Sequence, residues 1–401
     1  MKRSTLALSI GALLAGGQTA LAQDMPSAEE MWRIIQQQQK QIQELKARVE
    51  DTDMKADAAV EAVESGGGTG GGATWAETTQ IGGYGELHYN NLDGSGGASD
   101  KDELDFHRFV LFVNHQFSDN IRLFTELEIE HALAGEGQPG EVELEQAYVE
   151  MDLNDYHRAK AGVFLLPVGI LNETHEPNTF YGVERNPIEK NIIPTTWWAA
   201  GAGLSGELGQ GFSYDLGVHE GLRITDATSF AVRGGRQKSA EADASDLAYT
   251  GRLKYTGMPG LELATTLQHQ TDITQGSVAN AGSANLFEAH GIYSKGPFGL
   301  RALYARWDLD GSGPETVGAD EQFGWYIEPS FRLNEKWGLF ARYNEWDNRA
   351  GNSSQSEMTQ VDVGVNFWPH PDVVLKADYQ MQDNDNGQDQ DGFNLGVGYQ
   401  F

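Results

Sequence analysis

Acidic, basic and aromatic residues that could line a narrow opening are concentrated in one segment, residues 167–198. Carboxylates and cations facing each other across a constriction create a transverse electric field and a size limit, by which ions and small solutes can be filtered. The alternative is that the segment forms an external lid or a contact between subunits. We interpret the following residues as the constriction set: Glu173, His175, Glu176, Tyr181, Glu184, Arg185, Glu189 and Lys190.

A second set of charged residues recurs at every other position of short apolar segments. In one of them, Ile121, Leu123 and Leu127 alternate with Arg122 and Glu126. A charge facing lipid at mid-membrane costs about 2–4 kcal/mol, so the charged positions are expected to face an aqueous interior. Over all the inward positions of these segments, from which the wall set below is drawn, twelve acids stand against nine bases, which predicts a mixed or weakly cation-attracting lining. The wall set comprises Arg122, Glu126, Glu128, Glu130, Arg158, Lys160, Arg252, Lys254, Arg332, Arg342, Lys376 and Asp378, and the same rule places Arg306 inward.

The segments that position these residues alternate apolar and polar side chains from Ile81 to Phe401, and their connectors alternate between tight and long. Transmembrane barrels have short turns at one rim, longer loops at the other, and a period of two along each strand. The sequence therefore predicts an all-β fold, a 16-stranded antiparallel transmembrane β-barrel preceded by a short α-helical coiled coil. The expected strands are 81–90, 104–117, 120–131, 142–153, 157–166, 199–208, 212–219, 247–256, 260–270, 285–294, 298–308, 322–333, 336–347, 358–368, 372–382 and 392–401.

The residues before the barrel divide into three parts. Residues 1–22 have the basic start, apolar stretch and small-residue cleavage site of a secretory signal peptide. Residues 23–64 carry a heptad pattern that predicts the coiled coil, with a solitary solvated helix as the alternative. A flexible glycine-rich linker at 65–76 then leads to the barrel domain, 77–401.

The composition excludes several classes of function. The 401 residues include no cysteine, which removes thiol catalysis and thiolate metal ligands. A formal net charge of −31 disfavours binding to nucleic acid. Forty-nine glycines and 10% aromatic residues against twelve prolines suit many strands and turns.

Other possible sites have weaker support. A barrel hydrolase needs a serine and a polar residue beside a histidine; His115 and His131 are available, but no serine is evidently partnered. The acidic stretch 383–391 could hold calcium, although its glycine is misplaced for an EF-hand loop. His175 beside Glu176 is a candidate metal pair. We expect no catalytic residue, no resident metal and no cofactor.

Two stretches carry a family resemblance. Residues 161–169 (Ala-Gly-Val-Phe-Leu-Leu-Pro-Val-Gly) and 180–185 (Phe-Tyr-Gly-Val-Glu-Arg) resemble the phosphate-selective porins O and P. The resemblance implies a trimeric passive channel with a third loop folded inward. Phosphate-selective members use a ladder of lumenal bases, to which Arg122, Arg158, Lys160, Arg252 and Lys254 could correspond. Neighbouring acids depart from that pattern, so phosphate selectivity is not carried over.

These features together predict a porin of the outer membrane of a Gram-negative bacterium. The expected function is a passive aqueous channel for ions and small hydrophilic solutes. A phosphate- or dicarboxylate-selective anion channel is the alternative, and an outer-membrane hydrolase is a more remote one. Expected partners are two further copies of the chain, membrane lipids and lipopolysaccharide, the barrel-assembly machinery that reads the terminal Phe401, and peptidoglycan beneath the coil.

Overall fold

The structure, a computed structural model, describes residues 72–401. The predicted signal peptide, the coiled coil and the start of the linker lie outside the described residues. The described part begins with helix α3 (Gly72–Thr78), which occupies the end of the predicted linker. Among residues 72–401, no helix combines the length and apolar character needed to cross a membrane.

Residues 79–400 form sixteen β-strands, one in each segment for which the sequence predicts a strand. Predicted and observed strand boundaries differ by only a few residues. The strands are β1 (Thr79–Gly94), β2 (Lys101–Ser118), β3 (Ile121–Glu130), β4 (Val142–Asn154), β5 (His157–Leu165), β6 (Trp198–Gly209), β7 (Phe212–His219), β8 (Ala248–Met258), β9 (Leu261–Gln270), β10 (Ala284–Lys295), β11 (Phe298–Leu309), β12 (Glu321–Arg332), β13 (Trp337–Asp347), β14 (Met358–His370), β15 (Val373–Gln382) and β16 (Gln390–Gln400).

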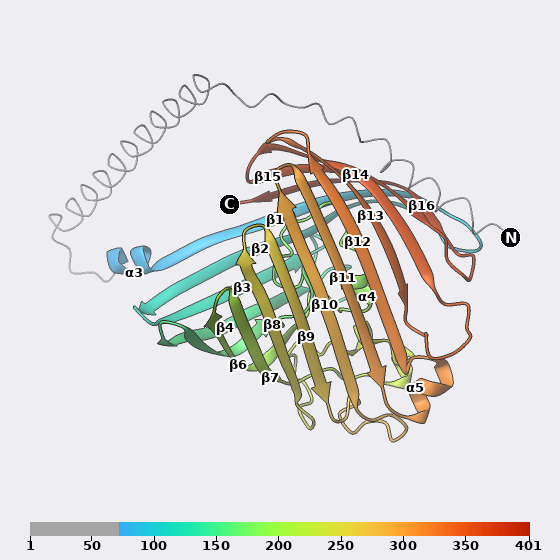
Figure 1. Ribbon diagram of the computed structural model, residues 1–401, viewed down its shortest axis with the longest axis horizontal. Coiled ribbons are helices and arrows are strands. Elements are labelled where there is room, and N and C mark those ends of the chain that lie inside the picture. The colour runs from blue at the N-terminus through green and yellow to red at the C-terminus, as the bar shows by residue number, and fades with distance from the viewer. Residues whose placement is uncertain (1–71) are drawn as a thin grey trace. The chain divides into compact units, whose positions relative to one another are not determined.

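Each strand pairs with its sequence neighbours, and β1 pairs with β16, so the sheet closes into a barrel (Figure 1). All pairings are antiparallel, and the closing register runs from Tyr84 opposite Gln400 to Gly94 opposite Gln390. The terminal residue takes part, because the backbone N–H and C=O of Phe401 both bond Gly83 at 2.9 Å. Closure leaves no unpaired sheet edge, as a structure surrounded by lipid requires.

The long connectors carry four short helices. They are α4 (Ile188–Asn191), η1 (Asp226–Thr228), η2 (Val232–Gly235) and α5 (Ser312–Val317). Two of these connectors matter for the site. We call residues 166–197, which join β5 to β6, the β5–β6 loop, and residues 220–247 the β7–β8 loop.

The alternation of side chains follows the prediction on most strands. On β3, Leu127 is 39% exposed on the outer face, whereas Glu126 and Glu128 are each 1% exposed. On β15, Leu375 is 41% exposed, whereas Lys376 is 5% exposed. The period of two therefore sorts apolar groups outward and charged groups inward.

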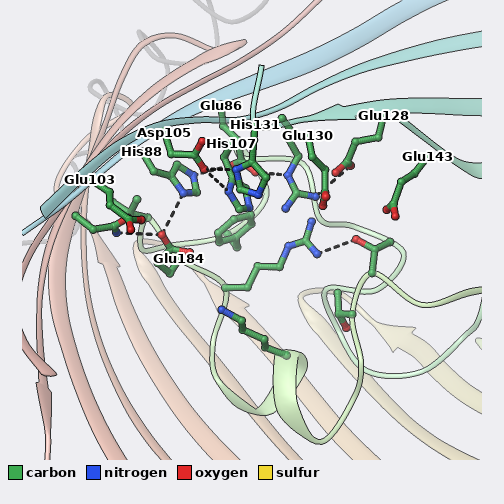
Figure 2. A pocket seen from close by; sticks show the side chains of 18 of the residues that line it. Glu86, His88, Glu103, Asp105, His107, Glu128, Glu130, His131, Glu143 and Glu184 are labelled. Carbon is green, nitrogen blue, oxygen red and sulfur yellow. Dashed lines mark hydrogen bonds and ion pairs between the residues drawn. The ribbon is translucent and has the colours of Figure 1, made fainter. Parts of the chain in front are cut away.

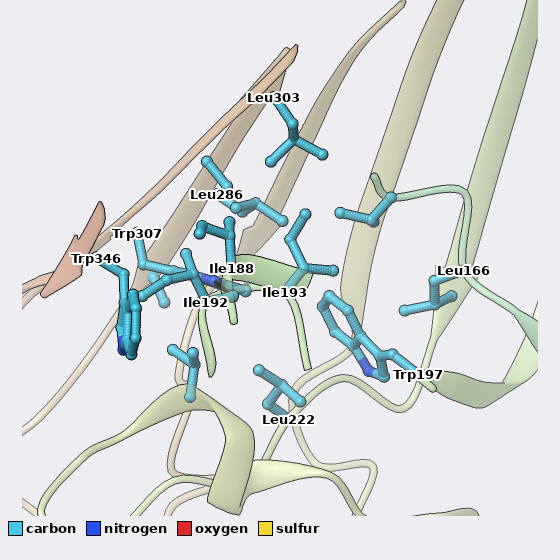
Figure 3. Packing of buried hydrophobic residues seen from close by; sticks show 14 of the residues in the cluster. Leu166, Ile188, Ile192, Ile193, Trp197, Leu222, Leu286, Leu303, Trp307 and Trp346 are labelled. Carbon is cyan, nitrogen blue, oxygen red and sulfur yellow. Dashed lines mark hydrogen bonds between the residues drawn. The ribbon is translucent and has the colours of Figure 1, made fainter. Parts of the chain in front are cut away.

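One part of the interior departs from this rule. Buried apolar side chains of the β5–β6 and β7–β8 loops pack against inward-facing apolar side chains of β10, β11 and β13. Figure 3 shows this cluster, which includes Leu166, Ile188, Ile192, Ile193, Trp197, Leu222, Leu286, Leu303, Trp307 and Trp346.

Toward the long-loop end of β11, from Leu303 to Leu309, the inward positions are apolar, because the loops supply an apolar partner there. Leu303, Ala305, Trp307 and Leu309 are at most 4% exposed. The inward placement of Arg306 was therefore wrong. Its guanidinium pairs with Asp308 at 2.6 Å and with Glu321 at 3.0 Å, on positions that alternate with the buried ones.

Candidate functional site

The β5–β6 loop contacts inward-facing groups from strands around the barrel. Thr266 of β9 donates its hydroxyl to the carbonyl of Pro167 at 3.0 Å. Arg301 of β11 donates to the carbonyl of Thr179 at 2.7 Å. Trp307 Nε1 donates to the carbonyl of Ile192 at 2.9 Å. A loop held by bonds from several strands is fixed in place by the wall itself.

Two charged residues of the loop pair with predicted wall charges. Glu173 forms an ion pair with Arg252, which also lies 2.7 Å from Asp215. His175 is buried, and its Nε2 lies 3.3 Å from Glu126 and 3.4 Å from Glu145. Burial alone would favour the neutral imidazole, but the carboxylates outweigh it and raise the pKa of His175 to about 10. These pairs attach the loop to oppositely charged residues on β3, β4 and β8.

Glu189 organises the loop internally instead of lining an opening. It is 0% exposed, and its carboxylate accepts hydrogen bonds from the backbone N–H groups of Ile170 (2.6 Å) and Leu171 (2.5 Å). The amide of Asn186 (2.9 Å) and the hydroxyl of Tyr326 (3.1 Å) complete its shell. A buried carboxylate needs such donors. The assignment of Glu189 to the constriction set is corrected accordingly.

The far part of the loop rests on β13, β14 and β15. Asp378 accepts a hydrogen bond from the N–H of Val183 at 2.7 Å. Tyr181 stacks on Phe340 at 5.5 Å between ring centroids, and Lys376 Nζ lies 3.5 Å from the ring centre of Phe180. Tyr181 therefore packs against an aromatic ring, Lys376 forms a cation–π interaction, and Asp378 accepts a hydrogen bond from the loop backbone.

Arg342, also from the predicted wall set, sits in a buried network. It lies 2.9 Å from Asp362 and 3.2 Å from Glu328, and it donates to the carbonyl of Tyr181 at 3.4 Å. Arg332 lies over the ring of Trp368, 3.7 Å from its centre. Arg342 is therefore held by wall groups and by the loop, and Arg332 by an aromatic ring of the wall.

The remaining wall bases lie toward the tight-turn rim. Arg122 pairs with Glu150 at 2.8 Å and Asp152 at 2.5 Å, and Arg158 lies 3.3 Å from Asp152. Lys160 Nζ lies 4.4 Å from the ring centre of Phe164. Lys254, the last of the wall bases, is half-buried. Glu176 of the β5–β6 loop is half-buried as well.

A cavity of about 310 Å³ lies where the two loops meet β1 to β4 (Figure 2). Its acids come mainly from these strands, and Figure 2 shows Glu86, Glu128, Glu130 and Glu143 along them, with Glu184 below. Its loop-derived bases are Arg185, Lys190, Arg233 and Arg236. The arrangement brings charges of both signs to one opening, which is the requirement for a transverse field.

Most acids of this cavity already have a cationic or polar partner. Arg108 lies 2.8 Å from Glu86 and 3.3 Å from Glu128. Glu143 pairs with Lys238 of the β7–β8 loop. These pairs neutralise much of the acidic wall.

Glu184 joins the β5–β6 loop to β1. Its Oε1 lies 3.1 Å from His88 Nδ1 and accepts a hydrogen bond from the amide of Asn90 at 3.0 Å. Burial alone would raise the pKa of the Glu184 carboxyl, but the interactions with His88 outweigh burial and hold that pKa well below its ordinary value. Glu184 is therefore ionised at neutral pH.

The loop bases have no carboxylate partner among the described ion pairs. Arg185 donates to the Thr196 hydroxyl at 2.8 Å. Arg233 donates to the carbonyls of Lys190 (2.8 Å) and Thr195 (3.1 Å), and Arg236 to that of Thr196 (2.6 Å). Their positive charge remains available to a solute in the cavity.

Three charged residues on the strands escaped the sequence analysis, and β-bulges explain why; Arg233 and Arg236 of the β7–β8 loop were missed as well. Between β3 and β4 the register shifts at Glu126/Leu127, which face Gln146 and Leu144 and leave Glu145 as the extra residue. The inward parity therefore changes along β4, so that Glu143 and Glu145 are buried. A second shift between Glu86 and His88 turns Arg108 inward. A bulge changes which parity faces in, and no feature of the period-two pattern marks it.

The predicted hydrolase, calcium and His175–Glu176 arrangements do not form among the described residues, although His175 lies within metal-ligand spacing of Glu126 and Glu145. His115 bonds the Thr79 hydroxyl at 2.7 Å, and His131 bonds Asp105 at 2.8 Å; neither bonds a serine. Within the described chain, no set of three metal-ligating groups falls in the stretch 383–391. His175 pairs with Glu126 and Glu145, not with Glu176.

A closed sixteen-stranded antiparallel barrel, charged inside and apolar outside, is the architecture of an outer-membrane channel. Comparison with known proteins agrees. Residues 80–401 match the family described as phosphate-selective porin O and P, and the chain belongs to that family. The prediction of a porin in the outer membrane of a Gram-negative bacterium is thereby confirmed, and the protein is a channel and not an enzyme.

Other known proteins resemble this chain in sequence or in fold. An uncharacterized protein of Aquifex aeolicus is 30% identical over 362 residues, covering 80% of this chain and 79% of the relative. An anion-selective porin from Comamonas acidovorans has a TM-score of 0.57 at 12% identity, covering 81% of this chain and 99% of that one. The outer membrane protein OmpT of Vibrio cholerae, in its trimer form, has a TM-score of 0.52 at 11% identity, with 81% and 99% covered.

Proposed function

We propose that the chain forms a passive diffusion pore for ions and small hydrophilic solutes, narrowed by the β5–β6 loop. The observation that carries this proposal is the shared cavity, in which strand acids and loop bases face one opening. A solute passing between them meets a transverse field and a size limit. Glu173 and His175 tether the loop, while Glu184, Arg185 and Lys190 present charge to the opening.

Because both signs line the cavity, the lumen is mixed in charge and only weakly selective. The test is the reversal potential of the purified full chain in a planar bilayer under a potassium chloride gradient. We expect a cation-to-anion permeability ratio within a few-fold of one. A pore that excludes one ion sign would contradict the mixed assignment, and an absence of conductance would contradict the pore itself.

Anion selectivity is the second candidate, and one observation favours it. Arg185, Arg233 and Arg236 bond neutral oxygens, whereas Glu86, Glu128 and Glu143 are paired with cations. The unneutralised groups are thus mainly cationic, and guanidinium groups suit phosphate and carboxylate. The family name and the anion-selective relative point to the same class of solute.

Paired substitutions distinguish the two candidates. Arg233→Gln and Arg236→Gln remove loop cations, and Glu130→Gln removes a strand acid of the same cavity. If the lumen is mixed, the arginine variants move the reversal potential toward cation preference and Glu130→Gln moves it toward anion preference by a similar amount. If the pore is an anion channel, the native protein already prefers anions and only the arginine variants alter it strongly.

We further propose that the functional unit is a homotrimer, since a barrel of the same fold is described in a trimer form. Contacts with lipopolysaccharide, with the barrel-assembly machinery and with peptidoglycan remain predictions from the sequence. Chemical crosslinking of the purified protein in mild detergent tests the trimer. A single band at the monomer mass under conditions that preserve the barrel would rule it out.

A further inference from the structure

Two histidines and one aspartate converge at the long-loop end of the barrel. Asp105 and His107 of β2 both line the cavity, as does His131, which directly follows β3. The backbone N–H of His131 donates to the carbonyl of His107 at 3.1 Å, so strand pairing brings the two imidazoles together. Figure 2 shows the three side chains grouped beside His88 on the cavity wall.

Both imidazoles point the same ring atom at one carboxylate oxygen. His131 Nδ1 lies 2.8 Å from Asp105 Oδ2, and His107 Nδ1 lies 3.2 Å from the same oxygen. One donor atom from each residue falls within 4.8 Å of the others. Ligands about 2.0–2.2 Å from a tetrahedral metal ion are separated by about 3.3–3.6 Å, so small side-chain shifts suffice to seat an ion.

The surroundings hold this group in place and leave it accessible. The ring of His88 stacks on that of His107 at 4.6 Å between centroids, and His88 is itself held by Glu86 and Glu184. The side chains of the three converging residues, Asp105, His107 and His131, are 24%, 28% and 34% exposed. Oriented rings with an open side leave room for an ion and for one further ligand.

We propose that Asp105, His107 and His131 bind a divalent transition-metal ion of the Zn²⁺ class in the outer part of the pore. Neutral imidazole and carboxylate suit this class of ion, whereas Ca²⁺ and Mg²⁺ prefer an all-oxygen shell. Three protein ligands leave the fourth position for water or a passing anion.

The test is calorimetric titration of the purified full chain in detergent with Zn²⁺ alone. The ligand variants are His107→Gln and His131→Asn; asparagine suits the left-handed backbone at position 131, where φ is 53°. The matched control is His269→Gln, because His269 is exposed on β9 and bonds only Asn285 in the described structure. Circular dichroism verifies that each variant keeps the barrel.

We expect the native protein and His269→Gln to bind one Zn²⁺ per chain with the same affinity. Each ligand variant should bind at least about tenfold more weakly. Native-like Zn²⁺ affinity in His131→Asn, no stoichiometric binding by the native protein, or displacement of Zn²⁺ by an equal concentration of Ca²⁺ would each overturn the proposal. Binding in detergent does not require conduction, so failure here leaves the pore proposal standing.

Discussion

His175 Nε2 lies 3.3 Å from Glu126 Oε1, and this ion pair joins the β5–β6 loop to strand β3. Both side chains are at most 3% exposed, and Glu145 of β4 lies 3.4 Å from the same nitrogen. A buried pair is sensitive to loss of one member, because the remaining charge is left without compensation. The attachment of the loop to β3 and β4 therefore depends strongly on one histidine.

Replacing His175 by glutamine should release the loop from β3 and β4. Loss of one member of a buried pair costs about 3–5 kcal/mol. Backbone amides of the loop should then exchange hydrogen at least about a hundredfold faster, as measured by mass spectrometry. His157→Gln is the control, since His157 bonds Tyr214 and not the loop. Equal protection of the loop in both variants would show that the ion pair does not hold it.

Alkaline pH should weaken the same attachment. The pKa of His175 is raised to about 10 in the folded protein, from about 6.5 when unfolded. A raised pKa means that the stabilisation is complete below pH 6.5 and is lost as the pH rises through 10. Loop hydrogen exchange, corrected for its intrinsic pH dependence, should accelerate over this interval in the native protein. His175→Gln should show no such dependence.

Acid should release the other side of the loop, at Glu184. Its pKa is held below its ordinary value by His88, with smaller contributions from His107 and Lys190. The stabilisation is therefore complete above about pH 4.3, the unfolded pKa, and is lost as the pH falls through the lower folded value. Single-channel conductance should change below pH 4.

Two variants locate that acid transition. Glu184→Gln should show the acid conductance already at neutral pH, because it lacks the charge that protonation removes. Glu176→Gln, in the same loop at a half-buried position, should titrate like the native protein. If the acid transition persists unchanged in Glu184→Gln, a group other than Glu184 is responsible for the transition.

Trp307 should stabilise the apolar contact between loop and wall. It is 0% exposed, and its Nε1 donates to the carbonyl of Ile192. Trp307→Ala should lower the free energy of unfolding by about 3–5 kcal/mol. Trp325 lies at an outward-facing position of β12. Trp325→Ala should therefore lower the free energy of unfolding by less, and thermal melting in detergent compares the two variants. A larger loss from Trp325 would contradict the proposed role of the internal core.

The sixteen strands were predictable because their signal is local. Lipid outside and water inside impose a period of two, as on β3, where Leu127 and Glu126 face opposite sides. Closure through β1 and β16 follows from an even count of antiparallel strands. The opposed charges of the wall, Arg122 and Glu150 among them, were readable from the same period.

The charge pattern at the cavity was decided by the tertiary structure. β-Bulges next to Glu126 and Glu86 changed which residues of β4 and β2 face the interior, and turned Glu145 and Arg108 inward. The position of an extra residue in a strand is determined by hydrogen bonding to the neighbouring strand. The alternation of side chains along one strand carries no information about that pairing.

The sequence by itself determined the barrel, its strands and the identity of the charged loop, because each rests on residues close together in the chain. Only the tertiary structure decided that Glu189 clamps the loop, that Trp307 faces inward, and that His107 meets His131. These placements depend on partners far away in sequence. Their burial becomes favourable only once the loop has packed against the wall and excluded water.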